Sequence, residues 1–209
     1  DEVVALARQL PKANMGLRSI CAVWLTLATG CRVGELMNAQ WQHIDLEKRT
    51  WHLPDTKNQR PHTVHLSDFA VQQIQNLATM RVKTPADLPC PWVFPNTKGS
   101  NALDIKTFGK QLSDRQRPPE KRLSNRTAAT ESLSLPGGKW TAHDLRRTAA
   151  TTMASLGISS DVIDECLNHM IQSRVTRIYI RDRREGEQVK AFDALGQRLA
   201  DLVALAVKA

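Results

Sequence analysis

A histidine and an arginine lie three residues apart in "TAHDLRRTAATTMASL", at the start of a predicted helix. Thr141 and Asp144 have the spacing of a capping box, so we expect the helix to begin at Thr141. His143 and Arg146 then share one face of its first two turns. Free backbone N–H groups and the positive end of the helix dipole already favour an anion there. This face predicts a phosphate ligand, although His-x-x-Arg is also common on solvated helix faces.

A second arginine, Arg32, stands at another predicted helix start, just after Gly30 in "TGCRVGEL". A cation at this end opposes the helix dipole and costs about a few tenths of a kcal/mol, unless an external anion lies between them. Glu35 can brace the guanidinium, or the two can form an ordinary surface ion pair. Lys57 lies in the polar turn "DTKNQRP". A lysine there can protonate a leaving group, though most turn lysines are only solvated.

The one tyrosine of the chain, Tyr179, lies in "RVTRIYIRDR", inside the densest arginine cluster. His169 precedes it by ten residues and follows Asn168, which predicts a helix stop because asparagine tolerates the left-handed conformation. A histidine at a helix end often does no more than meet the negative end of the dipole, and a lone tyrosine is usually structural. Each of these signals is modest alone, and together with the arginines and Lys57 they are much more specific.

The motifs "TGCRVGEL", "DTKNQRPHTVHL", "HDLRRTAAT", "LNH" and "RIY" occur in this order between about residues 15 and 182. In order and spacing they resemble the catalytic domain of the tyrosine recombinases, the phage integrase family, and most of all the integrases of temperate phages and genomic islands. The resemblance implies a site-specific recombinase that integrates or excises a mobile element. It would cleave and rejoin DNA through a covalent 3′-phosphotyrosine intermediate, with no metal and no cofactor.

The resemblance also implies a role for each matched residue. The catalytic set is Tyr179 as nucleophile, Arg32 and Arg146 on the scissile phosphate, Lys57 as general acid, His143 as general base, and His169 as a hydrogen-bond donor to the phosphate. Glu35 matches the acidic position that supports the first arginine. Asn168 is a departure, because the family usually has glycine there. The candidate contacts to the DNA backbone are Arg60, Arg147, Arg174 and Arg177. The other arginines near the tyrosine, Arg181, Arg183 and Arg184, read as solvated or backbone-contacting charges.

Composition agrees with a nucleic-acid partner without proving one. The formal net charge is +8, and a surplus of this size suits a polyanion. No apolar run approaches the length of a membrane span. The four cysteines are widely spaced and are expected to be free thiols in a reducing compartment: Cys21, Cys31, Cys90 and Cys166. Together with these features, the resemblance implies a bacterial cytoplasmic protein that joins the nucleoid when it binds DNA.

The apolar periodicity predicts a mostly helical domain with one small three-stranded antiparallel sheet. The sheet is expected as a meander within residues 41–66, and the helices on either side of it. Residues 113–139 are polar and lack periodicity, which predicts a mobile, basic surface loop. Residues 186–207 predict an amphipathic helix. That helix is a candidate to dock on a neighbouring subunit, and folding back on its own domain is the alternative.

We interpret residues 1–209 as one catalytic domain cut from a longer protein. The family's N-terminal DNA-clamping domains would lie outside it. The full-length protein is expected to act as a tetramer on double-stranded attachment sites, and the 209 residues alone as a monomer. Weak DNA binding and poor recombination by this fragment are the consequence.

Three other classes compete with the recombinase interpretation. A type IB topoisomerase shares the chemistry but relaxes supercoils. A non-enzymatic helix-turn-helix module could span residues 155–179, with Gly157 in the turn. That reading leaves Arg32 and Lys57 without a purpose. A metal-dependent nuclease is the third, and activity in a chelator would argue against it.

Overall fold

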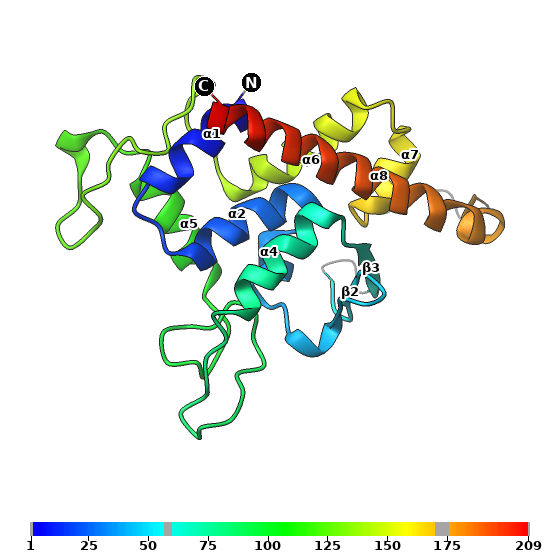
Figure 1. The fold of residues 1–209 in the computed structure, drawn as a ribbon, viewed down its shortest axis with the longest axis horizontal. Helices are drawn as coiled ribbons and strands as arrows, with labels where there is room; N and C mark the ends of the chain where they lie inside the picture. The colour runs from blue at the N-terminus through cyan, green and yellow to red at the C-terminus, as the bar shows by residue number, and fades with distance from the viewer. Residues whose placement is uncertain (1, 57–59, 170–175, 209) are drawn as a thin grey trace.

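A central helix organises the domain. The computed structural model describes residues 2–56, 60–169 and 176–208, and gives only the course of the backbone for residues 176–183. Helix α2 (Leu17–Thr29) is buried along its second half, from Cys21 to Thr29. Around it pack α4 (Asp68–Ala78), α6 (Ala142–Ser155) and α8 (Thr176–Lys208), and α1 (Glu2–Gln9) packs against α8 (Figure 1). No helix in the described part of the chain is long and apolar enough to cross a membrane.

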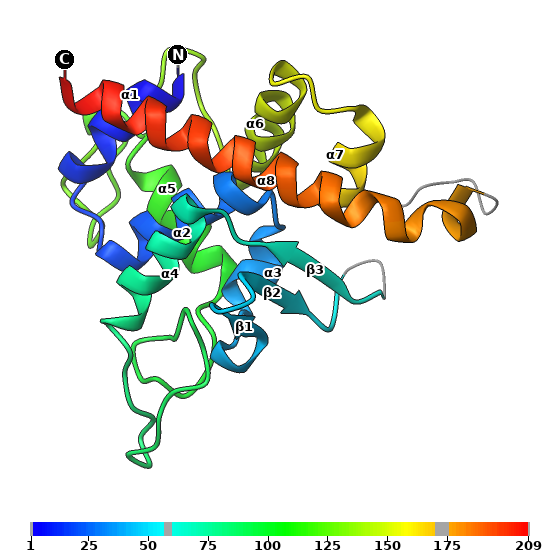
Figure 2. The ribbon, with the colours of Figure 1, turned by 45° about the vertical axis from the view of Figure 1, so that its right-hand side comes forward.

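The predicted meander is confirmed. Strands β1 (Ile44–Asp45), β2 (Thr50–Leu53) and β3 (His62–His65) pair antiparallel in the order β1-β2-β3. Trp51 lies opposite Val64, and both side chains are buried, which is the period-2 burial of a sheet with one inward face. The sheet lies beside the short helix α3 (Val33–Met37), at one end of the helical body (Figure 2).

The remaining elements are short. Helix α5 (Ile105–Asp114) begins at Asp104, whose carboxylate accepts from two backbone N–H groups. Helix α7 (Ser160–Cys166) follows α6 after the left-handed Gly157. Three single turns of 3-10 helix complete the set: η1 (Leu10–Lys12), η2 (Trp41–His43) and η3 (Pro119–Lys121). The capping prediction is confirmed: Thr141 and Asp144 form the predicted box at the start of α6.

The stretch 113–139 is anchored at both ends. Its first two residues complete α5, and the largely buried Arg115 donates from Nε to the carbonyl of Ala13 at 2.6 Å. Near the other end Leu133 is fully buried, and its carbonyl accepts from Trp140 Nε1 at 2.9 Å. Most of the residues between lie on the surface, as predicted. The anchors are single residues, so they leave no periodic signal in the sequence.

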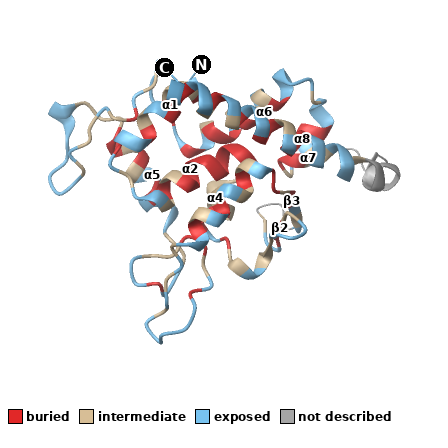
Figure 3. Ribbon diagram, viewed as in Figure 1, coloured by how far each residue is buried: buried red, intermediate tan, exposed pale blue. Residues whose placement is uncertain are grey.

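Helix α8 packs along its own domain. Its buried residues face α1, α4 and α7, and they include Ala191, Phe192, Leu195, Leu199 and Leu202 (Figure 3). This is the fold-back arrangement that the sequence left as the alternative, and docking on a second subunit remains a prediction. The sequence did not predict that the segment with Tyr179 and the C-terminal helix form one continuous helix, Thr176–Lys208.

Candidate phosphate-binding site

The first arginine is held at the start of α3. Arg32 occupies the N-cap position, and its backbone N–H donates to Glu35 Oε2 at 2.9 Å. Its Nη1 donates to the other carboxylate oxygen of Glu35 at 3.0 Å. The Glu35 side chain is 9% exposed, whereas that of Arg32 is 25% exposed. The carboxylate therefore fixes the guanidinium from the protein side and leaves part of it open to solvent.

The second arginine is buried and holds two helix ends. Arg146 is 5% exposed. Its Nη1 donates to the carbonyl of Gly30 at 2.5 Å and its Nη2 to the carbonyl of Leu167 at 2.6 Å. These carbonyls end α2 and α7, where the helix itself supplies no partner. Arg146 thus fixes the relative positions of α2, α6 and α7, and its own orientation is fixed in return.

The two guanidinium groups are close enough to interact electrostatically. Burial, and next the neighbouring Arg32 cation, lower the pKa of Arg146, while Glu35 acts in the opposite direction. Both arginines stay charged at neutral pH, because an arginine is not deprotonated in a protein. Two cations against one carboxylate leave net positive charge at the ends of three helices. An anion with several oxygen acceptors is the ligand that this arrangement favours.

The end of α7 brings further predicted residues to the same place. Asn168 adopts the predicted left-handed conformation, with φ of 51°. Its Nδ2 donates to Thr56 Oγ1 at 3.1 Å, and that hydroxyl donates to the Arg60 carbonyl at 2.8 Å. Thr56 and Arg60 flank the turn that contains Lys57. Asparagine at position 168 therefore contacts the segment between β2 and β3, and glycine has no side chain to make that contact.

His169 lies directly after this stop and is exposed. Its backbone N–H donates to the carbonyl of Asp164 at 2.8 Å, and its Nδ1 lies 2.8 Å from Asp164 Oδ1. The Asp164 carboxylate therefore favours the tautomer of His169 that carries its hydrogen on Nδ1. His143 is exposed in the first turn of α6. Within the described residues no hydrogen bond joins His143 to either arginine of the site.

The other predicted residues fall outside the site or outside what the structure describes. Lys57 and Arg174 lie outside the described residues, and of Tyr179 and Arg177 only the backbone, within α8, is described. Arg60 is exposed. Arg147 is exposed and pairs with Asp144 at 3.3 Å.

The interpretation of Arg184 as a solvated or DNA-contacting charge is wrong. Its guanidinium pairs with Glu165 at 2.9 Å and with Asp161 at 3.2 Å. Both acids are on α7, against which α8 packs. The Arg184 guanidinium is therefore part of the contact between α7 and α8.

His62 is the residue that sequence reasoning missed. Its Nε2 lies 3.1 Å from the carbonyl of Cys166, in the last turn of α7. Burial is the main cause that lowers its pKa, and Arg146 and Arg32 add to that effect. A signal was present: in "RPHTVHL", His62 has the same parity as the buried Val64, which places it on the inward face of β3.

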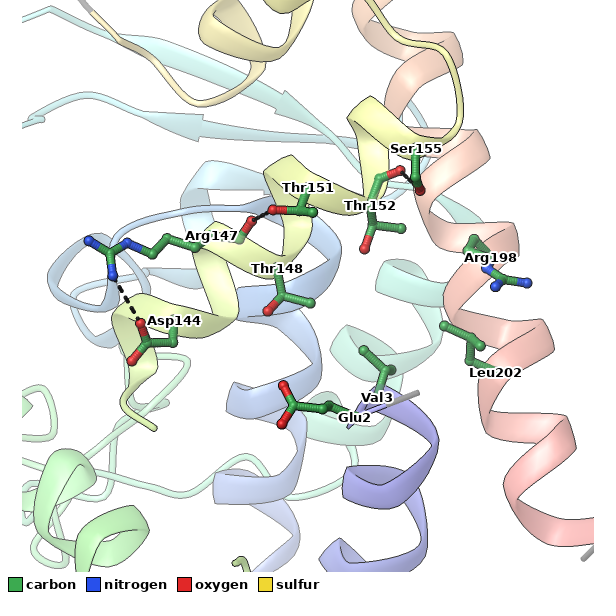
Figure 4. A pocket seen from close by; sticks show the side chains of 10 residues that line it. All are labelled: Glu2, Val3, Asp144, Arg147, Thr148, Thr151, Thr152, Ser155, Arg198 and Leu202. Atoms are coloured by element: carbon green, nitrogen blue, oxygen red, sulfur yellow. Dashed lines mark hydrogen bonds and ion pairs between the residues drawn. The ribbon is translucent and has the colours of Figure 1, made fainter. Parts of the chain in front are cut away.

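A cavity of about 430 Å³ lies on a different face of α6 (Figure 4). Thr148 and Thr152 of α6 line it together with Val3 of α1 and Leu202 of α8. Arg146 is not among its lining residues, because its guanidinium points to the ends of α2 and α7. The candidate site is thus separate from this cavity.

The four cysteines are free, as predicted, and all of them are buried. Burial raises the pKa of Cys31, the neighbour of Arg32, to about 12, so this thiol is protonated at neutral pH. Among the residues that the structure describes, no three histidine, cysteine, aspartate or glutamate side chains group as metal ligands would.

The fold is a helical domain with a small three-stranded sheet, and it brings Arg32 and Arg146 together at the ends of its helices. Comparison with known families gives it a name: residues 1–185 match the phage integrase family, and this chain belongs to that family.

Curated relatives agree. The chain is 27% identical over 184 residues to prophage integrase IntA of Escherichia coli K12, which covers 87% of this chain and 38% of the relative. It is 29% identical over 181 residues to tyrosine recombinase XerA of Pyrococcus furiosus, a match that covers 87% of this chain and 55% of the relative. The chain thus spans only part of the length of these relatives.

Solved structures share the fold. The integrase of mycobacterium phage Brujita superposes with a TM-score of 0.63 at 16% identity, over 94% of this chain and 61% of that one. The XerH recombinase bound to its difH substrate, a pre-cleavage complex, gives a TM-score of 0.61 at 21% identity. This match covers 91% of this chain and 52% of that one. The predicted fold class, mostly helical with a small antiparallel sheet, is confirmed.

Gly30 should be costly to replace. Its φ is +59°, and a Cβ built there would lie 2.4 Å from Leu167 Cδ2, a side chain that is itself buried. Gly30→Ala is therefore expected to lower the free energy of unfolding by about 2–3 kcal/mol, from backbone strain and from the displaced leucine together. Chemical denaturation of the wild type and the variant measures this difference in the free energy of unfolding.

Gly157→Ala is the matched control. Its φ is +81°, but nothing lies within 4 Å of the added Cβ. Only the strain of the left-handed conformation remains, about 1 kcal/mol. Equal losses in the two variants would show that Leu167 does not constrain Gly30.

Proposed function

We propose that this chain is the catalytic part of a site-specific DNA recombinase that cleaves and rejoins strands through a covalent 3′-phosphotyrosine. The observation that carries the proposal is the meeting of Arg32 and Arg146 at three helix ends, with a net positive charge. Membership of the phage integrase family and the names of the relatives, integrases and recombinases, support it.

In the proposed reaction Tyr179 attacks the scissile phosphorus. A bond forms between the phenol oxygen and phosphorus, and the bond from phosphorus to the 5′-oxygen of the DNA breaks. His143 takes the phenol proton, and Lys57 gives a proton to the leaving 5′-oxygen. A 5′-hydroxyl from a second DNA end reverses these steps, so rejoining needs no external energy source.

The arginines stabilise the charge that develops on the non-bridging oxygens. A guanidinium has five N–H donors, and two of those on Arg146 are used by the Gly30 and Leu167 carbonyls. The others remain for a phosphate. Because Arg146 is already oriented by these bonds, little reorganisation is needed when the transition state forms. Arg32, held by Glu35, supplies the second fork. His169 donates to the phosphate from Nε2 only as an imidazolium, because its Nδ1 hydrogen is directed at Asp164.

The proposed partner is double-stranded DNA that contains the attachment sites of a mobile element. Contacts to its backbone would come from Arg60, Arg147, Arg174 and Arg177, and affinity would fall steeply with salt. The full-length protein would assemble as a tetramer on DNA and act in the bacterial cytoplasm. Solved relatives bound to their own DNA substrates, such as XerH on difH, support a DNA partner.

Covalent capture tests the proposal. The 209-residue chain is incubated in EDTA with nicked duplexes whose core sequence is randomised, and SDS-resistant adducts are recovered and sequenced. Wild-type protein is expected to give adducts, and Tyr179→Phe none. Cleavage that needs a divalent metal would favour a nuclease. Relaxation of plasmids without recombinant product would favour a type IB topoisomerase.

A further inference from the structure

The last turn of α7 is a meeting point for three other elements. The carbonyl of Cys166 lies 3.1 Å from His62 Nε2 on β3, and the carbonyl of Leu167 accepts from Arg146 Nη2 on α6 at 2.6 Å. The side chain of Asn168 donates to Thr56, beyond the end of β2, at 3.1 Å. The final carbonyls of a helix lack partners within it, so outside donors must supply them. Here the donors come from the hairpin and from the arginine of the site.

The Cys166 contact determines where the hydrogen of His62 lies. A carbonyl oxygen only accepts, so Nε2 must carry the hydrogen. Of the residues whose side chains the structure describes, the charged ones around the ring are Arg32 and Glu35 from α3 and Arg146 from α6. Burial and the two arginines lower the pKa of His62, while the Cys166 carbonyl and Glu35 raise it, and the lowering effects prevail. At neutral pH the ring is therefore neutral, with its hydrogen on Nε2.

We propose that His62 is a positioning residue of the phosphate site: its neutral ring ties β3 to the end of α7, and so holds in place the Leu167 carbonyl that orients Arg146. This rests on the proposed function. Leu167 directly follows Cys166, so a shift of one carbonyl moves the other. His62 has no bond to substrate in this account. It acts through α7 and Arg146, and a neutral donor at the same place should serve as well.

The substitutions His62→Gln and His62→Asn separate this role from the alternatives. Both residues are neutral amides. The glutamine amide nitrogen can reach the place of Nε2 and donate to Cys166, whereas the asparagine amide ends one methylene short. His65→Asn is the control on the same strand, because His65 Nε2 lies 3.0 Å from Asp193 of α8 and not near α7.

The measurement is the single-turnover rate at which the covalent adduct forms, with the DNA sequence recovered by covalent capture present at a saturating concentration. DNA affinity and melting temperature are measured on the same variants. His62→Asn should slow cleavage by about tenfold to a hundredfold, the size expected when a catalytic group is displaced by about an ångström. DNA affinity should change little, and the melting temperature should fall modestly because the Cys166 carbonyl loses its donor. His62→Gln and His65→Asn should cleave close to the wild-type rate.

Two results would overturn the inference while the proposed function stands. In one, His62→Asn cleaves as fast as wild type, so the tether is not needed. In the other, His62→Gln is as slow as His62→Asn, so the imidazole itself acts. A different result, no adduct even with wild-type protein, would reject the proposed function and the inference with it.

The neutral state has its own readout, independent of activity. Because the folded-state pKa of His62 is lowered, the unfolded chain takes up a proton that the folded chain does not. This residue should therefore cost stability as the pH falls below about 6.5, the ordinary histidine value, and nothing above it. His62→Gln should lose less stability than wild type over that window. An identical pH dependence in the two proteins would contradict a neutral ring.

Discussion

Arg146→Lys is expected to reduce the rate of covalent adduct formation by about a hundredfold to a thousandfold, the cost of losing one oriented donor to the transition state. Lysine keeps the charge but has no planar fork, so it cannot hold the Gly30 and Leu167 carbonyls and two phosphate oxygens together. One buried carbonyl would lose its partner, at about 1–3 kcal/mol of stability. DNA affinity should change little, because the charge is retained. Single-turnover cleavage and denaturant unfolding measure the two effects.

Arg147→Lys is the control next in the chain. Arg147 is exposed and pairs only at 3.3 Å with Asp144, on the helix face that borders the separate cavity. Exposed ion pairs of this kind contribute little, and lysine keeps the charge that a contact of this residue to the DNA backbone would use, so neither cleavage nor stability should change much. Were Arg146→Lys and Arg147→Lys to cleave at similar rates, the central place given to Arg146 would be wrong.

Leu195→Ala is expected to lower the free energy of unfolding by about 2–5 kcal/mol, as for other fully buried leucines. The side chain is fully buried and belongs to the core of the domain. If α8 folds back on its own domain, the melting temperature of both wild type and variant should be independent of protein concentration. Calorimetry over a hundredfold concentration range would measure this.

Leu205→Ala provides the same change on the same helix at an exposed position. Leu205 is 53% exposed, so its truncation should cost less than about 1 kcal/mol. A melting temperature that rises with concentration, and rises less in Leu195→Ala, would contradict the fold-back arrangement. It would instead favour docking of this helix on a second subunit.

Local signals in the sequence predicted much of the fold. The Thr141–Asp144 box, the left-handed stop at Asn168 and the three-strand meander each depend on a few neighbouring residues. Such features are determined by the backbone preferences of particular residue types, so spacing alone reveals them. The site residues followed from the order of the motifs, and the structure places Arg32 and Arg146 together.

Contacts between distant elements could not be predicted from the sequence. Nothing in "HDLRR" indicates that Arg146 bonds to the ends of α2 and α7, because those partners are backbone carbonyls that carry no sequence signature. Arg184 was misread for a similar reason: its acids, Asp161 and Glu165, are paired with it only through the packing of α7 and α8. His62 had a weak signal in its strand parity, but its partner is again a carbonyl.

The central claim is that Tyr179 becomes joined to a DNA 3′ end at a site built on Arg32 and Arg146. The most direct measurement is mass spectrometry of the proteolysed covalent adduct, combined with end-labelling of the captured strand. We expect one modified peptide, containing Tyr179, linked to a 3′-phosphate, with a free 5′-hydroxyl on the released strand. An adduct on another residue, a link to a 5′-phosphate, or cleavage that persists in Tyr179→Phe would contradict the account.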